Sequence, residues 1–161
     1  ATYYIKDGEF GVCSRNLELL ETEGNTFWKV ARELNLEENM KATGKNISLQ
    51  GELIGEGIQG NSYKLTGREF YCFDIYDIDK REYLLPMERV LLCNRLNISH
   101  VPALGVYKLG SVDTIASILE GAEGKSEVGA KPEREGLVFK STKTHDVSFK
   151  AISNRWLEKY E

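Results

Sequence analysis

Residues 47–77 read ISLQGELIGEGIQGNSYKLTGREFYCFDIYD. The first part alternates between apolar and polar residues, which predicts a half-buried strand with Glu52 on its polar face. After a glycine-rich bend, Phe70–Tyr76 is a second strand pattern that is apolar or aromatic on both faces and contains a buried acid, Asp74. Rigid strands that hold a carboxylate beside such a bend are typical of a small-molecule site on a sheet. The pattern also fits a core hairpin whose Glu52 simply faces water.

Length and charge set the broad class. A chain of 161 residues fits one domain, residues 1–161, which can bury a core without disulfides. The 21 basic and 25 acidic residues give a net charge of -4. This charge does not indicate a protein that coats nucleic acid non-specifically, but it leaves room for a local basic groove.

The cysteines indicate a cellular location. Cys13, Cys72 and Cys93 are an odd number without CxxC spacing, and two of them fall in apolar patterns, so buried free thiols are predicted. Free thiols favour a reducing compartment, and a cytoplasmic protein is therefore expected. No apolar run approaches the length of a membrane span and no signal peptide is visible, so no membrane association is expected.

The sequence before residue 47 predicts a hairpin and two helices. Strands at Thr2–Ile5 and Glu9–Ser14 are joined by Asp7-Gly8, a pair that tolerates positive φ and favours a tight turn. A helix is predicted from a cap at Asn25 or Thr26 to about Leu36, followed by a short helical piece, Glu37–Thr43, that ends at Gly44. The buried stripe of the first helix is predicted to be Phe27, Val30, Ala31 and Leu34.

The sequence after residue 77 mixes helices with strands. Pro86 opens a helix to about Asn97, Val101–Leu104 is a candidate short strand, and Ser111 caps a helix that stops at Gly121. That helix is expected to turn Val112, Ile115, Ala116 and Leu119 inward. The predicted remainder consists of a mobile loop at residues 121–135 that closes over a site, strands at Gly136–Lys140 and Val147–Ile152, and a short helix at Arg155–Tyr160. Helices among antiparallel strands indicate the α+β class.

Charged residues at strand ends or inside strands are the candidates for chemistry. They are Arg15, Glu52, Glu135, Lys140 and Lys150. Acids and bases that converge on one cleft would suit a polyphosphate with a divalent metal, because carboxylates hold the metal and lysine neutralises phosphate charge. Taken singly, each of these residues also fits a solvated surface charge.

Other motif classes are absent from the sequence. It contains no P-loop and no GxGxxG between a strand and a helix. His100 and His145 lack metal-ligand spacing and are expected at the surface. Lys6-Asp7-Gly8 is superficially similar to the KxDG nucleophile motif of nucleotidyltransferases, but it lacks the intervening residue and falls in a hairpin turn.

Five segments occur in the order found in one known family. They are Cys13-Ser14-Arg15-Asn16 (motif Ia), Gly51-Glu52-Leu53 followed by Gly55-Glu56-Gly57-Ile58-Gln59 (motif III), Phe70–Ile75 (motif IIIa), Glu135–Lys140 (motif IV) and Ser148–Ala151 (motif V). With these segments the chain resembles, over nearly its whole length, the nucleotidyltransferase domain of ATP-dependent RNA ligases of the RNA-ligase-2 type. This family belongs to a wider superfamily with DNA ligases and mRNA capping enzymes.

The resemblance implies a fold and a reaction. The fold would be α+β, with antiparallel sheets flanked by helices around a nucleotide cleft, as in adenylyltransferase or ATP-grasp-like ligases. A motif I lysine would attack the α-phosphate of ATP, AMP would pass to an RNA 5′-phosphate, and an RNA 3′-hydroxyl would then displace AMP. ATP with Mg²⁺ or Mn²⁺ and RNA ends are the implied cofactors and partners, and a monomer is expected.

The resemblance also implies roles for individual residues. Glu52 would bind the ribose hydroxyls, Phe73 would stack on adenine, and Arg15 would meet phosphate or the RNA end. Glu135 would support the metal. Lys150 would contact the α-phosphate. Because Ile152 stands where the family often has a second motif V lysine, part of that role would shift to Lys140.

Two departures from the family pattern are visible. Motif I would fall just upstream of Ala1, so the chain is expected to be a fragment that forms no lysyl-AMP unaided. The second lysine of motif V is replaced by Ile152. Two alternatives remain open: a noncatalytic nucleotide- or RNA-binding module, and a DNA-ligase-like member of the superfamily.

Overall fold

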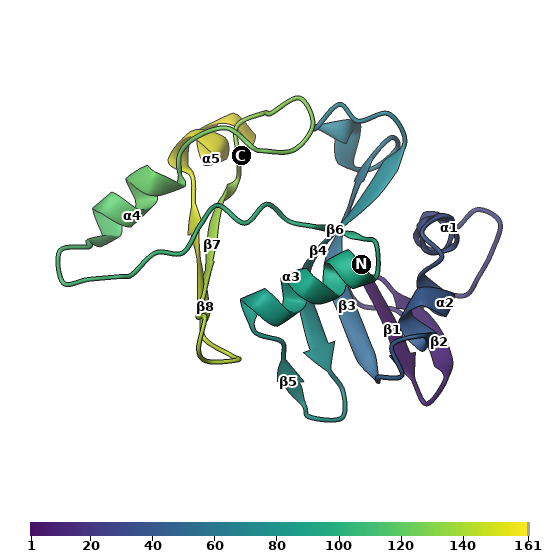
Figure 1. Cartoon of the computed structure of the whole chain (residues 1–161). Helices are drawn as coiled ribbons and strands as arrows, with labels where there is room; N and C mark the ends of the chain where they lie inside the picture. Colours follow the sequence, from purple (N-terminus) through teal and green to yellow (C-terminus); the bar gives the residue numbers. More distant parts are fainter. Residues whose placement is uncertain (161) are drawn as a thin grey trace.

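The β-strands form two separate sheets in the computed structural model, which describes residues 1–160 (Figure 1). The larger sheet has the order β2-β1-β3-β4-β5 with antiparallel neighbours, and β6 pairs in parallel with β4. Its strands are β1 (Thr2–Lys6), β2 (Glu9–Cys13), β3 (Ile47–Gly55), β4 (Arg68–Asp77), β5 (Glu82–Tyr83) and β6 (Ser99–His100). The smaller sheet pairs β7 (Gly136–Lys140) with β8 (Ser148–Ile152). The α+β class is thereby confirmed.

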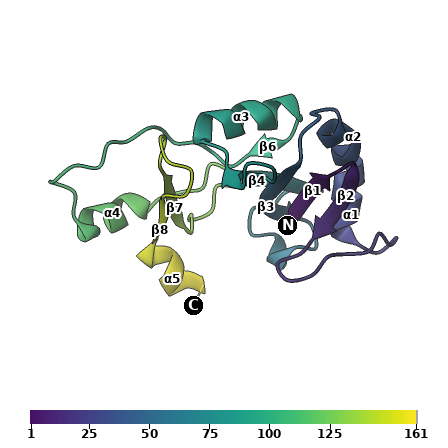
Figure 2. The same ribbon diagram turned by 90° about the horizontal axis from the view of Figure 1, so that it is seen from below.

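Helices accompany both sheets. Their bounds are α1 (Thr26–Glu33), α2 (Leu36–Lys41), α3 (Pro86–Arg95), α4 (Ile115–Ala122) and α5 (Asn154–Tyr160), with a 3₁₀ turn at η1 (Gln59–Asn61). Figure 2 shows α4, α5, β7 and β8 grouped at one end and α1, α2 and β1–β3 at the other, with α3 and β4 between them. Among the residues described, no helix is both long and apolar enough to cross a membrane.

The amino-terminal hairpin follows the sequence prediction. Asp7 and Gly8 have φ values of 51° and 80°, and β1 pairs with β2 from Thr2 opposite Cys13 to Lys6 opposite Glu9. Positive φ at both turn residues matches the right-handed twist of the strands that they join.

The first helical region differs from its prediction. Asn25 caps α1, since its side chain accepts hydrogen bonds from the N–H groups of Phe27 and Trp28. The first helix was predicted to reach about Leu36, but it ends at Glu33, because Asn35 takes a left-handed conformation (φ 52°, ψ 40°) and separates α1 from α2. Asparagine tolerates this conformation better than most residues.

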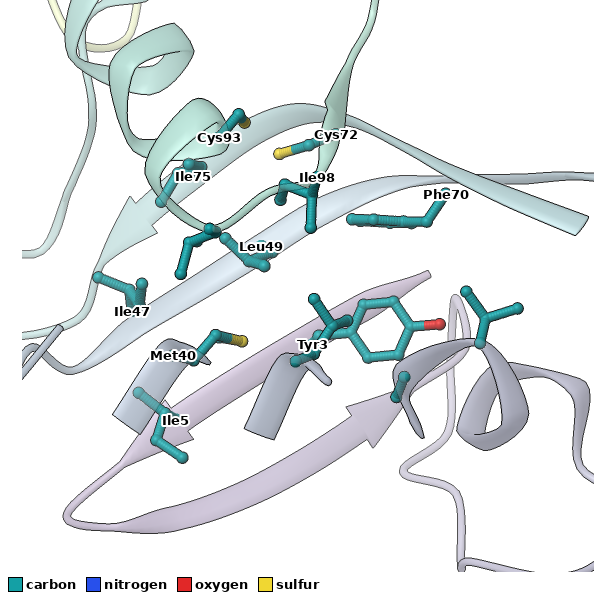
Figure 3. Packing of buried hydrophobic residues seen from close by; sticks show 14 of the residues in the cluster. Tyr3, Ile5, Met40, Ile47, Leu49, Phe70, Cys72, Ile75, Cys93 and Ile98 are labelled. Carbon is teal, nitrogen blue, oxygen red and sulfur yellow. The ribbon is translucent and has the colours of Figure 1, made fainter. Parts of the chain in front are cut away.

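One hydrophobic core covers one face of the larger sheet (Figure 3). Tyr3 and Leu49, opposite each other on β1 and β3, are both fully buried. Cys72 on β4 faces Cys93 on α3, and both are buried free thiols as predicted. Since side chains alternate along a strand, Gln50 and Glu52 lie on the opposite face, away from this core.

The region after β6 differs from its predictions in several places. Val101–Leu104 forms no strand, and the parallel pairing falls instead on Ser99–His100. Thr114 rather than Ser111 caps α4, so Val112 precedes the helix, and α4 runs past Gly121 to Ala122. Val112 and Ile115 are 87% and 80% exposed, so the predicted inward stripe is also wrong.

The segment predicted as a loop at residues 121–135 is irregular after α4 ends at Ala122, and it has defined anchors. The Arg134 guanidinium donates hydrogen bonds to the backbone oxygens of Gly121, Ala122 and Glu123. Ala130 N–H donates to the carbonyl of Tyr63 at 2.8 Å, which fastens the loop to the segment between β3 and β4. Its predicted mobility stays a prediction.

Candidate functional site

A cleft of about 830 Å³ lies beside β3, where Gln50–Leu53 line it together with the start of α1 and the bend after β3. Its lining includes Arg15, Gln50, Glu52, Gln59 and Phe73. Arg15 follows β2, Glu52 is on β3 and Phe73 is on β4. The sheet therefore brings three of the six predicted site residues to one cleft, although they are separated widely in the sequence.

A β-bulge gives Phe73 its position. Gln50 pairs with Asp74 and Gly51 with Cys72, so Phe73 has no partner on β3. The extra residue shifts the alternation of β4, so that buried positions fall at Cys72 and then Ile75. Phe73 remains 37% exposed and lines the cleft.

Gly51 permits the close approach of the two strands at this bulge. A Cβ on Gly51 would lie 2.3 Å from the backbone oxygen of Tyr71 and 2.5 Å from the Phe70 ring. Real Cβ atoms essentially never come so close. Glycine at position 51 is therefore a packing requirement of the strand that carries Glu52.

Lys140 and Asp74 form an ion pair behind Phe73. The Lys140 ammonium, at the end of β7, donates to Asp74 Oδ1 at 2.5 Å and to the backbone oxygen of Phe73 at 2.8 Å. It also lies 5.8 Å from the centroid of the Phe73 ring. Burial lowers the pKa of Lys140, while the nearby Asp74 carboxylate acts in the opposite direction. The smaller sheet is thus joined to the bulge of the larger one.

Arg89 on α3 is a second cation close to Asp74. Its side chain is 7% exposed, its Nη1 lies 3.7 Å from Asp74 Oδ1, and its Nε donates to His100 Nε2 at 2.9 Å. Burial lowers the pKa of His100, so the ring is neutral near pH 7 and can accept that hydrogen bond. The surface position predicted for His100 is wrong, because the ring is half-buried against Arg89; His145 is exposed as predicted.

Glu135 and Lys150 lie on the smaller sheet. Glu135 directly precedes β7, Lys150 is within β8, and the Lys150 ammonium donates to a Glu135 carboxylate oxygen. Neither residue lines the cleft described above. Burial and the charges of Glu52 and Glu135 raise the pKa of Tyr63, which puts this tyrosine within electrostatic range of both carboxylates.

The donor set fits a metal that keeps non-protein ligands. Among residues 1–160, no group of three or more His, Cys, Asp or Glu side chains could hold a metal ion alone. Mg²⁺ usually retains waters and binds one or two carboxylates together with substrate phosphates. The Glu135 carboxylate is compatible with that mode.

Sequence patterns did not reveal the residues behind the cleft. Arg89 occurs within the helical pattern PMERVLLCNR, which gave no sign that this charged side chain is buried. The strand pattern predicted a buried acid at Asp74, whose side chain is 24% exposed, but gave no sign of its partners, Lys140 and Arg89. Tyr63 had no sequence signal at all.

Comparisons with known proteins point to one family. A family model described as RNA ligase matches residues 1–152. A mutant of the Naegleria gruberi RNA ligase with ATP and Mn shares 48% sequence identity, has a TM-score of 0.92, and is matched over 99% of this chain and 48% of that chain. The same ligase with PPi shares 48% identity with a TM-score of 0.89, over 99% of this chain and 48% of that chain. No curated protein matches. The chain spans about half the length of the solved chains that it matches.

Proposed function

The chain belongs to the RNA ligase family, and from this premise we propose that it is the adenylyltransferase part of an ATP-dependent ligase that seals RNA 5′-phosphate and 3′-hydroxyl ends. The observation that carries the proposal is the cleft itself. One aromatic, one carboxylate and one arginine, namely Phe73, Glu52 and Arg15, line the same hollow. These are the groups needed for the base, ribose and phosphates of a nucleotide.

Phe73 is the proposed adenine platform. A partly exposed ring raised by a bulge presents a face on which a base can stack, and such stacking is worth about 1–3 kcal/mol. Glu52, which points into the same cleft, would accept hydrogen bonds from ribose hydroxyls. The Arg15 guanidinium would pair with a phosphate, of the nucleotide or of the RNA end.

Lys150 and Glu135 are the proposed groups at the reacting phosphate. Lys150 would neutralise charge on the α-phosphate, and Glu135 would help hold Mg²⁺ or Mn²⁺, which supplies charge neutralisation at the phosphates when bound. Their mutual ion pair keeps both side chains directed at each other until a nucleotide competes for them. Lys140, already bonded to Asp74 and Phe73, would act on the nucleotide through Phe73.

The proposed reaction has three displacements. A lysine amine attacks the α-phosphorus and pyrophosphate leaves, the RNA 5′-phosphate then displaces that lysine to form RNA-adenylate, and the 3′-hydroxyl finally displaces AMP. An attacking lysine must first lose its proton, and nearby cations lower its pKa. The 161 residues contain no KxDG motif, so this chain alone is proposed to bind nucleotide without forming lysyl-AMP.

The test combines calorimetry with intact mass. The chain is titrated with ATP in Mn²⁺, and its mass is then measured under denaturing conditions. Binding that is lost in Glu52→Ala, with no AMP adduct, is the expected result. Binding unaffected by Glu52→Ala would overturn the nucleotide site, and an adduct would show that a lysine of this chain, Lys6 first, is the nucleophile.

Substrate class and assembly are tested on a protein that joins this chain to a preceding segment with a KxDG lysine. Sealing of nicked RNA but not of nicked DNA is expected, whereas a preference for DNA would favour a DNA-ligase-like member. Binding without any sealing would favour a noncatalytic module. The chain is further proposed to be a cytoplasmic monomer, which light scattering and fractionation check.

A further inference from the structure

A second cavity, of about 220 Å³, is lined by both members of the Lys140–Asp74 ion pair, and Asp74 directly follows Phe73 of the nucleotide cleft. We propose that this cavity is a phosphate subsite next to the nucleotide cleft, with Arg89 as its main ligand; the inference rests on the proposed function. Its walls come from β4, the start of α3 and the turn between β7 and β8. Since one water occupies about 30 Å³ of liquid, the cavity has room for a phosphate group.

Arg89 directs unused donors into this space. Its Nε is bonded to His100, and Nη1 lies 3.7 Å from Asp74 Oδ1, beyond hydrogen-bond range. Within residues 1–160 neither Nη atom makes a hydrogen bond. Neither of them is fully buried. The Nη groups of this otherwise buried guanidinium therefore open onto the cavity that Arg89 lines. A planar guanidinium fork matches two oxygens of a phosphate.

The remaining lining is rich in donors. Ser141, Thr144 and Ser148 contribute hydroxyl groups, and Lys140 contributes its ammonium. Ser141 Oγ accepts from the N–H groups of Lys143 and Thr144, both at 3.1 Å, so its hydroxyl hydrogen is available to a ligand.

The charges of the cavity also favour an anion. Lys140 and Arg89 share the single carboxylate of Asp74, which leaves one positive charge in excess among these three groups. Asp146 also lines the cavity, but it is an exposed residue whose charge is screened by water. A phosphate would supply the acceptors that the Nη groups of Arg89 lack.

Two phosphates have this chemistry in a ligase: a phosphodiester of the RNA strand and free pyrophosphate. The experiment measures the affinity of the whole chain for two probes. Fluorescence anisotropy reports binding of a labelled, 5′-phosphorylated RNA, and calorimetry reports binding of sodium pyrophosphate. The variants are Arg89→Lys, which keeps the charge but loses the fork, and Thr144→Val, which spares Arg89. Lys143→Ala, in the same turn but outside the cavity lining, is the matched control.

The expected result is about a tenfold loss of affinity for one of the two probes in Arg89→Lys, as for one lost charge-assisted hydrogen bond, with a smaller loss in Thr144→Val and none in Lys143→Ala. Loss of RNA affinity assigns the phosphodiester, and loss of pyrophosphate affinity assigns the free anion. Unchanged affinity for both probes in both variants, or no binding of either probe by the unmodified chain, overturns the subsite.

ATP binding that depends on Glu52 is measured alongside, so the nucleotide site is judged separately. A melting curve for each variant separates loss of a ligand contact from loss of folding. If Arg89→Lys does not fold, the affinities of Thr144→Val decide the outcome.

Discussion

The Lys140 ammonium lies 2.8 Å from the backbone oxygen of Phe73, 67 residues away in the sequence, and so ties strand β7 to the bulge of β4. A bulged residue has no partner on the neighbouring strand, and its carbonyl needs another donor. Lys140 is that donor. The position of the aromatic ring in the cleft therefore depends on a side chain from the other sheet.

Replacing Phe73 with alanine should weaken nucleotide binding by about 1–3 kcal/mol, the value of one base–aromatic stack. The melting temperature should change little because the ring is partly exposed. Calorimetry with ATP checks the affinity, and Phe73→Trp should restore it. Tyr107→Ala, which removes an exposed aromatic ring remote from the cleft lining, is the control. Equal affinities of Phe73→Ala and the unmodified chain would remove Phe73 from the site.

Replacing Lys140 with methionine should lower the free energy of unfolding by about 1–3 kcal/mol, because it removes charge-assisted hydrogen bonds from a largely buried pair. Nucleotide affinity should fall too, since the Phe73 carbonyl loses its donor. Urea unfolding and calorimetry measure the two effects. Lys143→Met, on the same turn, should change neither. A variant with lower stability but full nucleotide affinity would show that the tie does not position the ring.

Stability should fall above pH 10 in a way that depends on Tyr3. Burial raises the pKa of Tyr3, whose hydroxyl donates to the Phe27 carbonyl at 2.9 Å. The unfolded chain then releases this proton near pH 10 while the folded chain retains it. The contribution is therefore full below pH 10 and is lost as the pH rises, by up to about 1.4 kcal/mol per pH unit.

The Tyr3→Phe variant isolates this effect. It should be less stable at pH 7 by about 0.5–1.5 kcal/mol, for one lost hydrogen bond, and it should lose stability less steeply above pH 10. Urea unfolding at several pH values gives both numbers. Parallel curves for the two proteins above pH 10 would contradict a raised pKa at Tyr3.

Replacing Glu135 with alanine should lower the apparent affinity for Mn²⁺ in the presence of ATP by at least about tenfold. ATP binding in EDTA should not fall, because the carboxylate would act through the metal. Stability should change by only about 0–1 kcal/mol, since the pair with Lys150 is roughly half exposed. Titration of Mn²⁺ at fixed ATP is the measurement, and Glu127→Ala is an acidic control in the adjoining loop. Equal losses with and without metal would point to a direct effect on the nucleotide.

Local chemistry explains which parts of the fold could be predicted from the sequence. Asp7-Gly8 sets its own turn, and the alternation from Ile47 to Leu53 marks a strand whatever lies beside it. Contacts between elements do not follow from local sequence in this way. The α4 pattern contains a stripe of apolar residues, but Ile115 remains exposed, because periodicity shows that a stripe exists and not that anything covers it.

The same limit applies to the candidate site. Motif order identified Arg15, Glu52 and Phe73, which the sheet brings to one cleft. The bulge at Phe73 could not be predicted, because register depends on how two strands pair. The burial of Arg89 also depends on tertiary contacts. Its helix was predicted from the sequence, but its neighbours Asp74 and His100 lie on strands β4 and β6, whose packing against that helix was not.

The separation of the two sheets has a consequence for how the molecule would respond to its ligand. Glu52 and Phe73 belong to the larger sheet, and Lys150 to the smaller. A nucleotide held by all three would act as a removable cross-link between two units that can open with different free energies. Amide hydrogen exchange in β7 and β8 should then slow when ATP is added, more than exchange in β1. Equal slowing in both sheets would mean that they already open together.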